Sequence, residues 1–167
     1  ISRRQSAAAQ PNELSRRLAL ALGIDPAGAV EEKGGVLAYQ GGDAEIPFKF
    51  TAGKSPAVLI LDPGGIAAAE KSAEYAKHKA AGRAILLIDA FQTGSAVAPR
   101  DRSHRHFLTF NRSDDAARAA DAAAAMAWLE KKQPGGIEVS AAGAARYWAL
   151  FGAAAGGRRV KLLFDAW

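Results

Sequence analysis

The chain has 167 residues, 49% of them hydrophobic, which suits one domain with a buried core and argues against intrinsic disorder. It contains no cysteine, so disulfides, thiol catalysis and cysteine metal sites are excluded. The net charge of +5 permits binding to nucleic acid or another acidic polymer, but the basic residues are scattered, as is typical of a solvated surface.

The sequence contains neither an apolar run of membrane-spanning length nor a recognisable signal peptide, so we expect no contact with a membrane. It starts at Ile1 instead of Met, which indicates a fragment or a processed product. An upstream signal is therefore not excluded. The compartment, cytoplasmic or exported, is left open.

The first fifty residues predict an arm, a helix and a hairpin. Residues 1–10 are expected to form a flexible arm, and leucine recurs at every fourth position in residues 11–22, which is helical spacing. Residues 36–40 and 45–51 predict two strands around a Gly41-Gly42-Asp43 turn.

The remainder of the chain alternates strands with helices. We expect strands at 57–61, 84–88 and 160–164 and a short strand that starts at Ile137. Helices are expected at 66–80, at 146–151 and up to Lys132, the last capped by Ser113, with a long loop at 91–112. This order predicts right-handed crossovers and a mostly parallel sheet with helices on both faces, edged by the antiparallel hairpin. We therefore divide the chain into an arm and helix, residues 1–33, and one α/β domain, residues 34–167.

Two loops are expected where ligands bind in such sheets, beyond the carboxyl ends of the strands. The glycines of Asp62-Pro63-Gly64-Gly65-Ile66 leave backbone N–H groups uncovered, which suits an oxyanion, although an ordinary strand-to-helix turn explains the pattern equally well. Asp89 opens the long loop. We expect it to anchor that loop by hydrogen bonds rather than to perform chemistry.

Within residues 137–145, a third loop joins a short strand to the following helix through a tight turn of very small residues. An esterase places its nucleophile at such a strand-to-helix elbow. The tip of this elbow falls on Gly143, which carries no nucleophile. A shifted frame would make Ser140 the nucleophile, but Glu138 then stands where a small residue is required.

Other motifs predict neither a metal nor a cofactor. His104 and His106 lack a third ligand at a convincing distance, and His78, between two lysines, is expected at the surface. Residues 52–55 end like a phosphate-binding loop but precede a strand, and the glycine-rich residues 152–157 end a helix where a dinucleotide fingerprint would open one.

Three segments together resemble the α/β-hydrolase family, and within it the bacterial acetyl-xylan-esterase-like and dienelactone-hydrolase-like proteins. They are Val58-Leu59-Ile60-Leu61-Asp62-Pro63-Gly64-Gly65, Leu86-Leu87-Ile88-Asp89-Ala90-Phe91-Gln92-Thr93-Gly94, and the elbow with its helix. The similarity covers roughly residues 34 to 167.

This resemblance implies that Gly64, Gly65 and Ala144 supply oxyanion N–H groups and that Gly143 occupies a vacant nucleophile position. The family also places its histidine after the last strands, whereas this chain has no histidine beyond His106. The chain therefore looks like a degenerate or incomplete hydrolase half that lacks the C-terminal strands.

Two functions are compatible with these features. The chain is either part of a carboxyl-ester hydrolase acting on acetylated or esterified carbohydrate, inactive alone, or a non-catalytic hydrolase-like domain that stabilises or binds a partner. An open sheet edge after the last strand would need a partner domain or chain to cover it. Nucleic-acid binding rests on net charge alone and is disfavoured.

Overall fold

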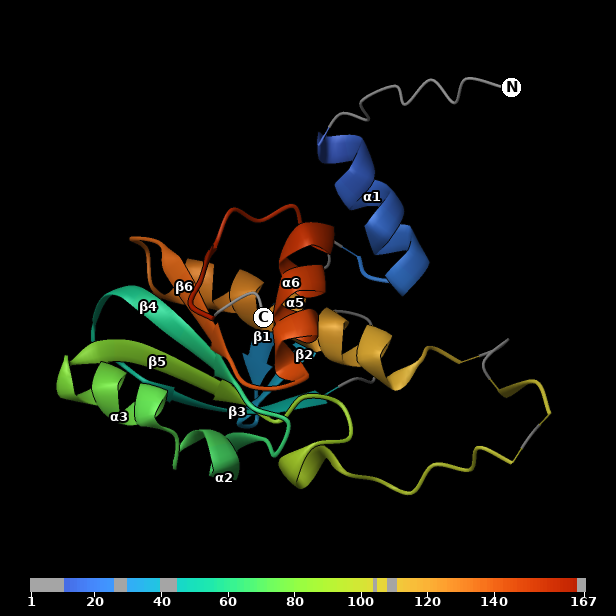
Figure 1. The fold of residues 1–167 in the computed structure, drawn as a ribbon, viewed down its shortest axis with the longest axis horizontal. Coiled ribbons are helices and arrows are strands. Elements are labelled where there is room, and N and C mark those ends of the chain that lie inside the picture. Colours follow the sequence, from blue (N-terminus) through green and yellow to red (C-terminus); the bar gives the residue numbers. More distant parts are fainter. Residues whose placement is uncertain (1–10, 26–29, 40–44, 104, 108–110, 165–167) are drawn as a thin grey trace.

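A computed structural model describes residues 11–25, 30–39, 45–103, 105–107 and 111–164, which form an α/β fold around one seven-stranded sheet (Figure 1). The strand order is β1-β2-β3-β5-β4-β6-β7. Strands β5, β4, β6 and β7 run parallel to one another, and β1, β2 and β3 extend the sheet with antiparallel pairing. The strands are β1 (Val30–Lys33), β2 (Val36–Tyr39), β3 (Glu45–Thr51), β4 (Lys54–Leu61), β5 (Arg83–Ile88), β6 (Ile137–Ala141) and β7 (Lys161–Leu162).

Helices cover both faces of this sheet (Figure 1). The elements are α1 (Pro11–Leu22), α2 (Ile66–Ala69), α3 (Ala73–Ala80), the 3-10 turn η1 (Gly94–Ala96), α5 (Asp114–Lys132) and α6 (Ala145–Ala155). Helices α5 and α6 pack on one face and α2 and α3 on the other. The α/β architecture and the antiparallel hairpin predicted from the sequence are confirmed.

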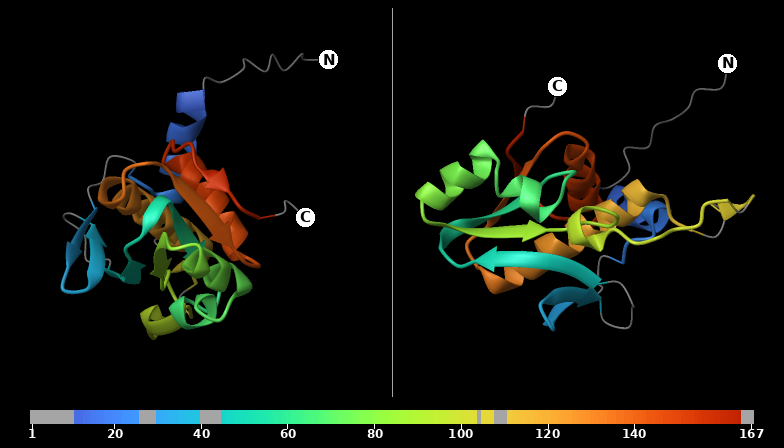
Figure 2. Two further views of the ribbon diagram at one scale, coloured as in Figure 1. Left: turned by 90° about the vertical axis from the view of Figure 1, so that its left-hand side faces the viewer. Right: turned by 90° about the horizontal axis from the view of Figure 1, so that it is seen from below.

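The strand β1 has no counterpart in the sequence prediction. It pairs antiparallel with β2, so Val30–Lys33 belongs to the sheet, although the sequence suggested a boundary after residue 33. Figure 2 shows this hairpin, in blue, at one side of the molecule. Three of the four β1 residues are exposed, so the segment lacks the alternation of apolar and polar residues that is typical of a half-buried strand. The Gly41-Gly42-Asp43 turn lies outside the described residues.

The helix expected over residues 66–80 is two helices. Ser72 separates them: its hydroxyl donates to the Ala69 carbonyl at 2.7 Å and accepts the Tyr75 N–H at 3.1 Å. The serine thus ends α2 and caps α3, a role for which serine is well suited. Ser113 caps α5 in the same way, as the sequence predicted, and accepts the Ala116 N–H at 3.2 Å.

Alternate residues of the central strands point into two different clusters. Leu59, Leu86 and Val139 face α5 and α6 in the main core, whereas Val58 and Ile85 face α2 and α3. Both clusters are fully shielded from solvent along these strands, which explains why the strands read as continuous apolar runs.

The small residues of α5 allow α6 to approach very closely. A β-carbon placed on Gly152 would lie 2.7 Å from the Ala119 carbonyl oxygen and 3.0 Å from the Ala123 nitrogen, so only glycine fits at this crossing. The larger residues of α5 face the sheet instead, where the centroids of the Trp128 and Phe48 rings are 5.1 Å apart.

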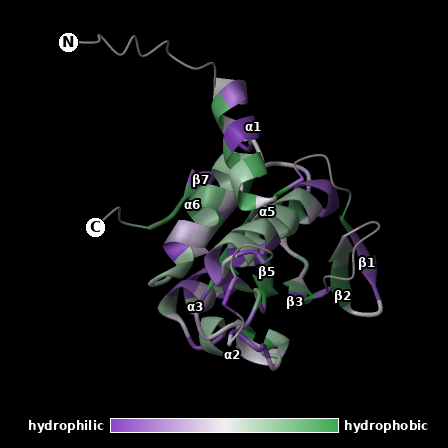
Figure 3. Cartoon of the chain, turned by 90° about the vertical axis from the view of Figure 1, so that its right-hand side faces the viewer, coloured by the Kyte–Doolittle hydropathy of each residue, from purple (hydrophilic) through white to green (hydrophobic). Residues whose placement is uncertain are grey.

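Helix α1 lies outside these layers and packs on α5 and α6. Its Ala19 joins a small cluster with alanines of both helices, and Leu18 and Leu22 pack against that cluster. Figure 3 shows hydrophobic and hydrophilic residues interspersed on α1. Leu14, expected on the same buried stripe, is 55% exposed, and Leu20 is 74% exposed. The leucine spacing thus predicted the helix correctly, but it did not predict which of its leucines pack against α5 and α6.

Candidate functional site

The bend expected around position 143 is present. β6 ends at Ala141 and α6 begins at Ala145, with Gly143 between them at a φ of +48°. The Ala142 N–H donates to the Leu61 carbonyl at 3.0 Å, which holds the bend against the end of β4. A β-carbon on Gly143 would lie 3.5 Å from Pro63 Cγ, an ordinary contact. The tip therefore has room for a side chain and faces the loop after β4.

That loop does not offer the free donors expected of its glycines. The Gly64 N–H donates to Asp62 Oδ1 at 2.8 Å, and the Gly65 N–H donates to the Asp62 carbonyl at 2.9 Å. The Ile66 N–H donates to Asp89 Oδ1 at 2.6 Å. Asp62 folds over its own loop, as aspartates in turns commonly do. The geometry is that of a closed strand-to-helix turn.

Asp89 ties this turn to the long loop. Besides Ile66 N–H, its carboxylate accepts the Ser95 N–H at 2.9 Å and the Ser95 hydroxyl at 2.6 Å. Gly65 and Gly94 both have positive φ, +75° and +49°, and a β-carbon on either would collide with the carboxylate. Two glycines on separate loops thus make the space in which Asp89 anchors them.

Ser140 lies within β6, not at the tip of the bend. It pairs with Ile60 in the parallel register and is 4% exposed. Gly143 and Ala144, by contrast, are exposed at the start of α6. Position 140 therefore belongs to the sheet interior, and the exposed end of this element carries no hydroxyl.

His78 is buried, contrary to the surface position expected from its lysine neighbours. It is 4% exposed, with Nδ1 at 3.3 Å from Arg83 Nη1 and Nε2 at 3.3 Å from Glu74 Oε2. Helical periodicity turns it inward while Lys77 and Lys79 stay exposed. Burial, and secondly the Arg83 charge, lower the pKa of His78, which favours the neutral imidazole.

His78 sits at the opposite end of the sheet from the elbow. Its neighbour Arg83 begins β5 and donates to Glu138 Oε2 at 2.6 Å, near the start of β6. Gly143 follows the end of β6. Of the other histidines, His106 is exposed in the long loop and His104 lies outside the described residues. No described histidine is thus placed to activate Ser140.

The long loop is held by an arginine that sequence reasoning assigned to the solvated surface. The Arg100 guanidinium lies between the Phe91 and Phe107 rings, 5.0 and 4.6 Å from their centroids. Its Nη1 donates to Asp114 Oδ1 at 2.6 Å, and Arg102 also pairs with Asp114. The nearby aromatic residues were the available signal, since guanidinium groups stack well on aromatic faces.

A buried carboxyl group lies under the start of this loop. Asp121 on α5 is 8% exposed and accepts the Phe91 N–H at 2.7 Å. Burial raises the pKa of Asp121 to about 7, against the opposing effects of the Phe91 hydrogen bond and the Arg112 charge. Arg118, three residues earlier on α5, donates from Nε to the Phe91 carbonyl at 2.9 Å. Both backbone groups of Phe91 are therefore bound to α5.

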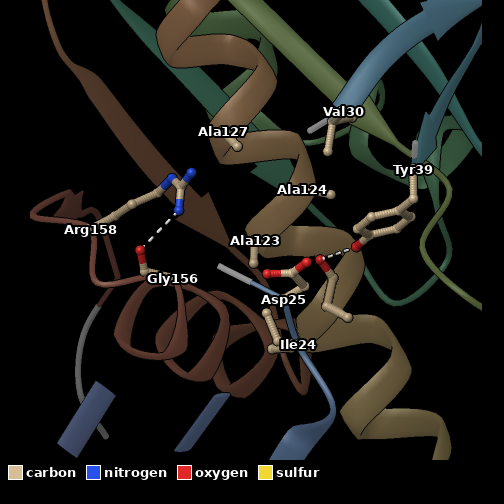
Figure 4. Close-up of a pocket in the computed structure, with 10 residues that line it drawn as sticks. Ile24, Asp25, Val30, Tyr39, Ala123, Ala124, Ala127, Gly156 and Arg158 are labelled. Atoms are coloured by element: carbon tan, nitrogen blue, oxygen red, sulfur yellow. Dashed lines mark hydrogen bonds between the residues drawn. The ribbon is translucent and has the colours of Figure 1, made fainter. Parts of the chain in front are cut away.

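The cavities of the described part of the chain include two that border the helices. The larger, of about 260 Å³, lies between α1, α5 and α6 and reaches the elbow. It is lined by Leu22, Ser113, Asp115, Ala116, Ala119, Ala144, Tyr147, Trp148 and Phe151. The smaller, of about 10 Å³, has room for a single water molecule. Figure 4 shows it between Tyr39, whose hydroxyl donates to the Ala120 carbonyl at 2.7 Å, and Arg158, which donates to the Gly156 carbonyl at 3.0 Å.

Within the described ranges, no group of three or more His, Asp or Glu side chains is arranged to hold a metal ion. Nor does any helix of that part of the chain have the length and apolarity needed to cross a membrane. No family model, curated protein or solved structure matches this chain.

Proposed function

We propose that this chain is a hydrolase-like domain that binds a ligand or partner and does not cleave esters on its own. The observation that carries the proposal is Gly143. It stands at the tip of a strand-to-helix bend, with the positive φ of +48° that a strained elbow uses, yet has no side chain. The bend provides the position of a nucleophile without the nucleophile.

The surroundings of the bend support the same conclusion. An oxyanion hole takes one N–H from the loop after a neighbouring strand, but Gly64 and Gly65 already donate their N–H groups to Asp62. A serine also needs a base within hydrogen-bond reach. Ser140 is enclosed in β6, and His78 lies near the other end of that strand.

Exposed apolar side chains on α6 and α1 support a binding role. Tyr147, Leu150 and Phe151 are each more than 40% exposed on α6, and Leu20 is 74% exposed on α1. Tyr147, Leu150 and Phe151 lie three or four positions apart and so share one face of α6, and a contiguous exposed apolar patch is typical of an interaction surface. In this proposal the α6 surface contacts either a ligand or a neighbouring domain or chain.

The second candidate is membership of a carboxyl-ester hydrolase whose remaining groups lie outside this chain, acting on acetylated or esterified carbohydrate. The strand-to-helix elbow and the exposed Ala144 beside it favour this candidate. It requires Ser140, or a group supplied in trans, to act as the nucleophile.

Hydrolysis of p-nitrophenyl acetate distinguishes the two candidates. We expect neither the chain nor the longest natural product of its gene to hydrolyse the ester faster than buffer alone, with or without the Ser140→Ala substitution. Circular dichroism verifies that each variant is folded. A rate above background in the chain alone would overturn the non-catalytic proposal. A rate in the longer product alone would establish the second candidate, through Ser140 if the rate disappears in Ser140→Ala and through a group outside this chain if it persists.

A further inference from the structure

We propose that the 260 Å³ cavity between α1, α5 and α6 binds one small aromatic molecule that carries no negative charge. The cavity extends from Ala144, at the elbow, to Leu22, at the end of α1. This inference deepens the binding role proposed above by naming the ligand class and the place where it binds.

The cavity exists because small residues line it where helices usually place large ones. Ala116 and Ala119 form the α5 wall, and Ala144 forms the end nearest the bend. A leucine at any of these positions would place three further carbon atoms in or beside the space. Protein interiors are otherwise packed with few voids larger than a water molecule.

Polar contacts from α5 fix Trp148 of α6 at the cavity wall. Trp148 Nε1 donates to Asp115 Oδ1 at 3.0 Å, and the Arg118 guanidinium lies over the Trp148 ring at 5.0 Å. Arg118 Nη1 also donates to Asp115 Oδ1 at 3.1 Å. These contacts hold the Trp148 ring at the cavity wall, so the space is already formed before a ligand arrives, as is usual for small-molecule sites.

The side chains at the wall indicate the class of ligand. Tyr147, Trp148 and Phe151 supply three aromatic rings from α6, and such rings favour offset or edge-to-face contact with another ring. Among the lining residues, Asp115 carries a charge and already pairs with Arg118. An anionic ligand would lose its hydration beside this carboxylate, whose side chain is 75% exposed, so the lining disfavours a negatively charged ligand.

The volume sets the size of the ligand. An apolar cavity of about 150 Å³ in another protein admits benzene, so 260 Å³ is suited to one or two fused rings. Tyr147 and Phe151 are 45% and 41% exposed, which leaves the cavity accessible from solvent. The ligand would cover parts of both rings.

Equilibrium dialysis of the whole chain against 2-naphthol tests the proposal. We expect saturable binding of one molecule per chain. Ala144→Leu should weaken it by at least about tenfold, because the new side chain occupies the ligand's space. Ala154→Leu is the matched control, since Ala154 is exposed on the same helix and does not line the cavity. It should bind as the unmodified chain does.

A second variant and a second probe complete the design. Ala116→Leu fills the cavity from α5 and should also abolish binding, so the test does not depend on one folded variant. 2-Naphthoate carries the same rings with a negative charge and should bind more weakly than 2-naphthol. The proposal is overturned if the unmodified chain shows no saturable binding, if both leucine variants bind normally, or if 2-naphthoate binds more tightly.

This measurement detects binding and not hydrolysis. Its failure would leave the non-catalytic assignment of the elbow intact. Conversely, an esterase rate dependent on Ser140 would overturn that assignment without affecting the cavity.

Discussion

Gly65 lies so close to Asp89 that a β-carbon at position 65 would overlap the carboxylate oxygen that accepts the Ile66 N–H. The contact joins two loops that follow different strands of the sheet, β4 and β5. Because Asp89 also accepts two hydrogen bonds from Ser95, one side chain fixes both loops. The glycine is therefore required by space as well as by its φ of +75°.

Gly65→Ala should lower the free energy of unfolding by more than about 2 kcal/mol, since it adds a collision and a weakened buried hydrogen bond to backbone strain. Gly82→Ala is the control, because Gly82 has a similar φ of +66° and nothing within 4 Å of its added β-carbon. It should cost only about 1 kcal/mol. Urea denaturation measures both, and equal losses would show that the Asp89 contact is unimportant.

Gly143→Ser should not create an esterase. The hydroxyl would fit, since the nearest atom to the new β-carbon is Pro63 Cγ at 3.5 Å, but His78 lies at the other end of the sheet and His106 is exposed in the long loop. Positive φ should cost about 1 kcal/mol of stability, equally for Gly143→Ala. Urea denaturation and p-nitrophenyl acetate assays on both variants check this. A serine-specific rate increase would contradict the expectation.

Asp121 should make the chain less stable as the pH rises. Its pKa is raised from 3.8 to about 7 in the folded chain. The folded state therefore binds a proton that the unfolded state has released, and this stabilising contribution, complete below about pH 4, is lost as the pH passes through 7. Asp121→Asn keeps an acceptor for the Phe91 N–H and removes the titration.

We expect Asp121→Asn to gain stability relative to the unmodified chain as the pH rises from 5 to 8, by an amount on the order of 1–3 kcal/mol. Urea denaturation at several pH values measures this difference. Glu31→Gln, which removes an exposed carboxylate on β1, serves as the control and should show no such trend. A constant difference between Asp121→Asn and the unmodified chain would show that Asp121 does not titrate in this range.

Unlike Asp121, His78 should make the chain less stable as the pH falls. Its pKa is lowered below the ordinary value of 6.5, so the unfolded chain takes up the proton first as the pH falls. The stability that neutral His78 contributes is present above about pH 6.5 and is lost below it. His78→Gln should remove this part of the acid sensitivity, whereas His106→Gln, at an exposed position, should not. Melting temperatures between pH 5 and 8 decide the matter; identical profiles for the two variants would refute the assignment.

Much of the fold follows from local sequence. The helix at residues 11–22 and the strand at 45–51 have the predicted bounds, because leucine spacing and alternating side chains report directly on one buried face. The cap at Ser113 and the bend at Gly143 could also be predicted, since a serine before a helix indicates an N-cap and a run of very small residues indicates a tight turn.

Other features depend on contacts between distant residues. Val30–Lys33 is a strand only because β2 lies beside it, and its exposed charged residues give no local sign of pairing. The N–H groups of Gly64 and Gly65 donate to Asp62. The composition of the loop was equally compatible with free N–H groups for an oxyanion and with this closed turn. The cavity depends on which alanines of α5 face α1 and α6, and that is set by helix packing.

Gly152 has a further consequence for how related sequences can vary. It meets α5 at the Ala119 carbonyl and the Ala123 nitrogen, both backbone atoms, so no exchange of side chains on α5 makes room for a larger residue. A larger residue at position 152 would be accepted only if α6 moved away from α5. Because Gly143 lies two residues before the start of that helix, we expect homologues that replace Gly152 to differ in the geometry of the elbow as well.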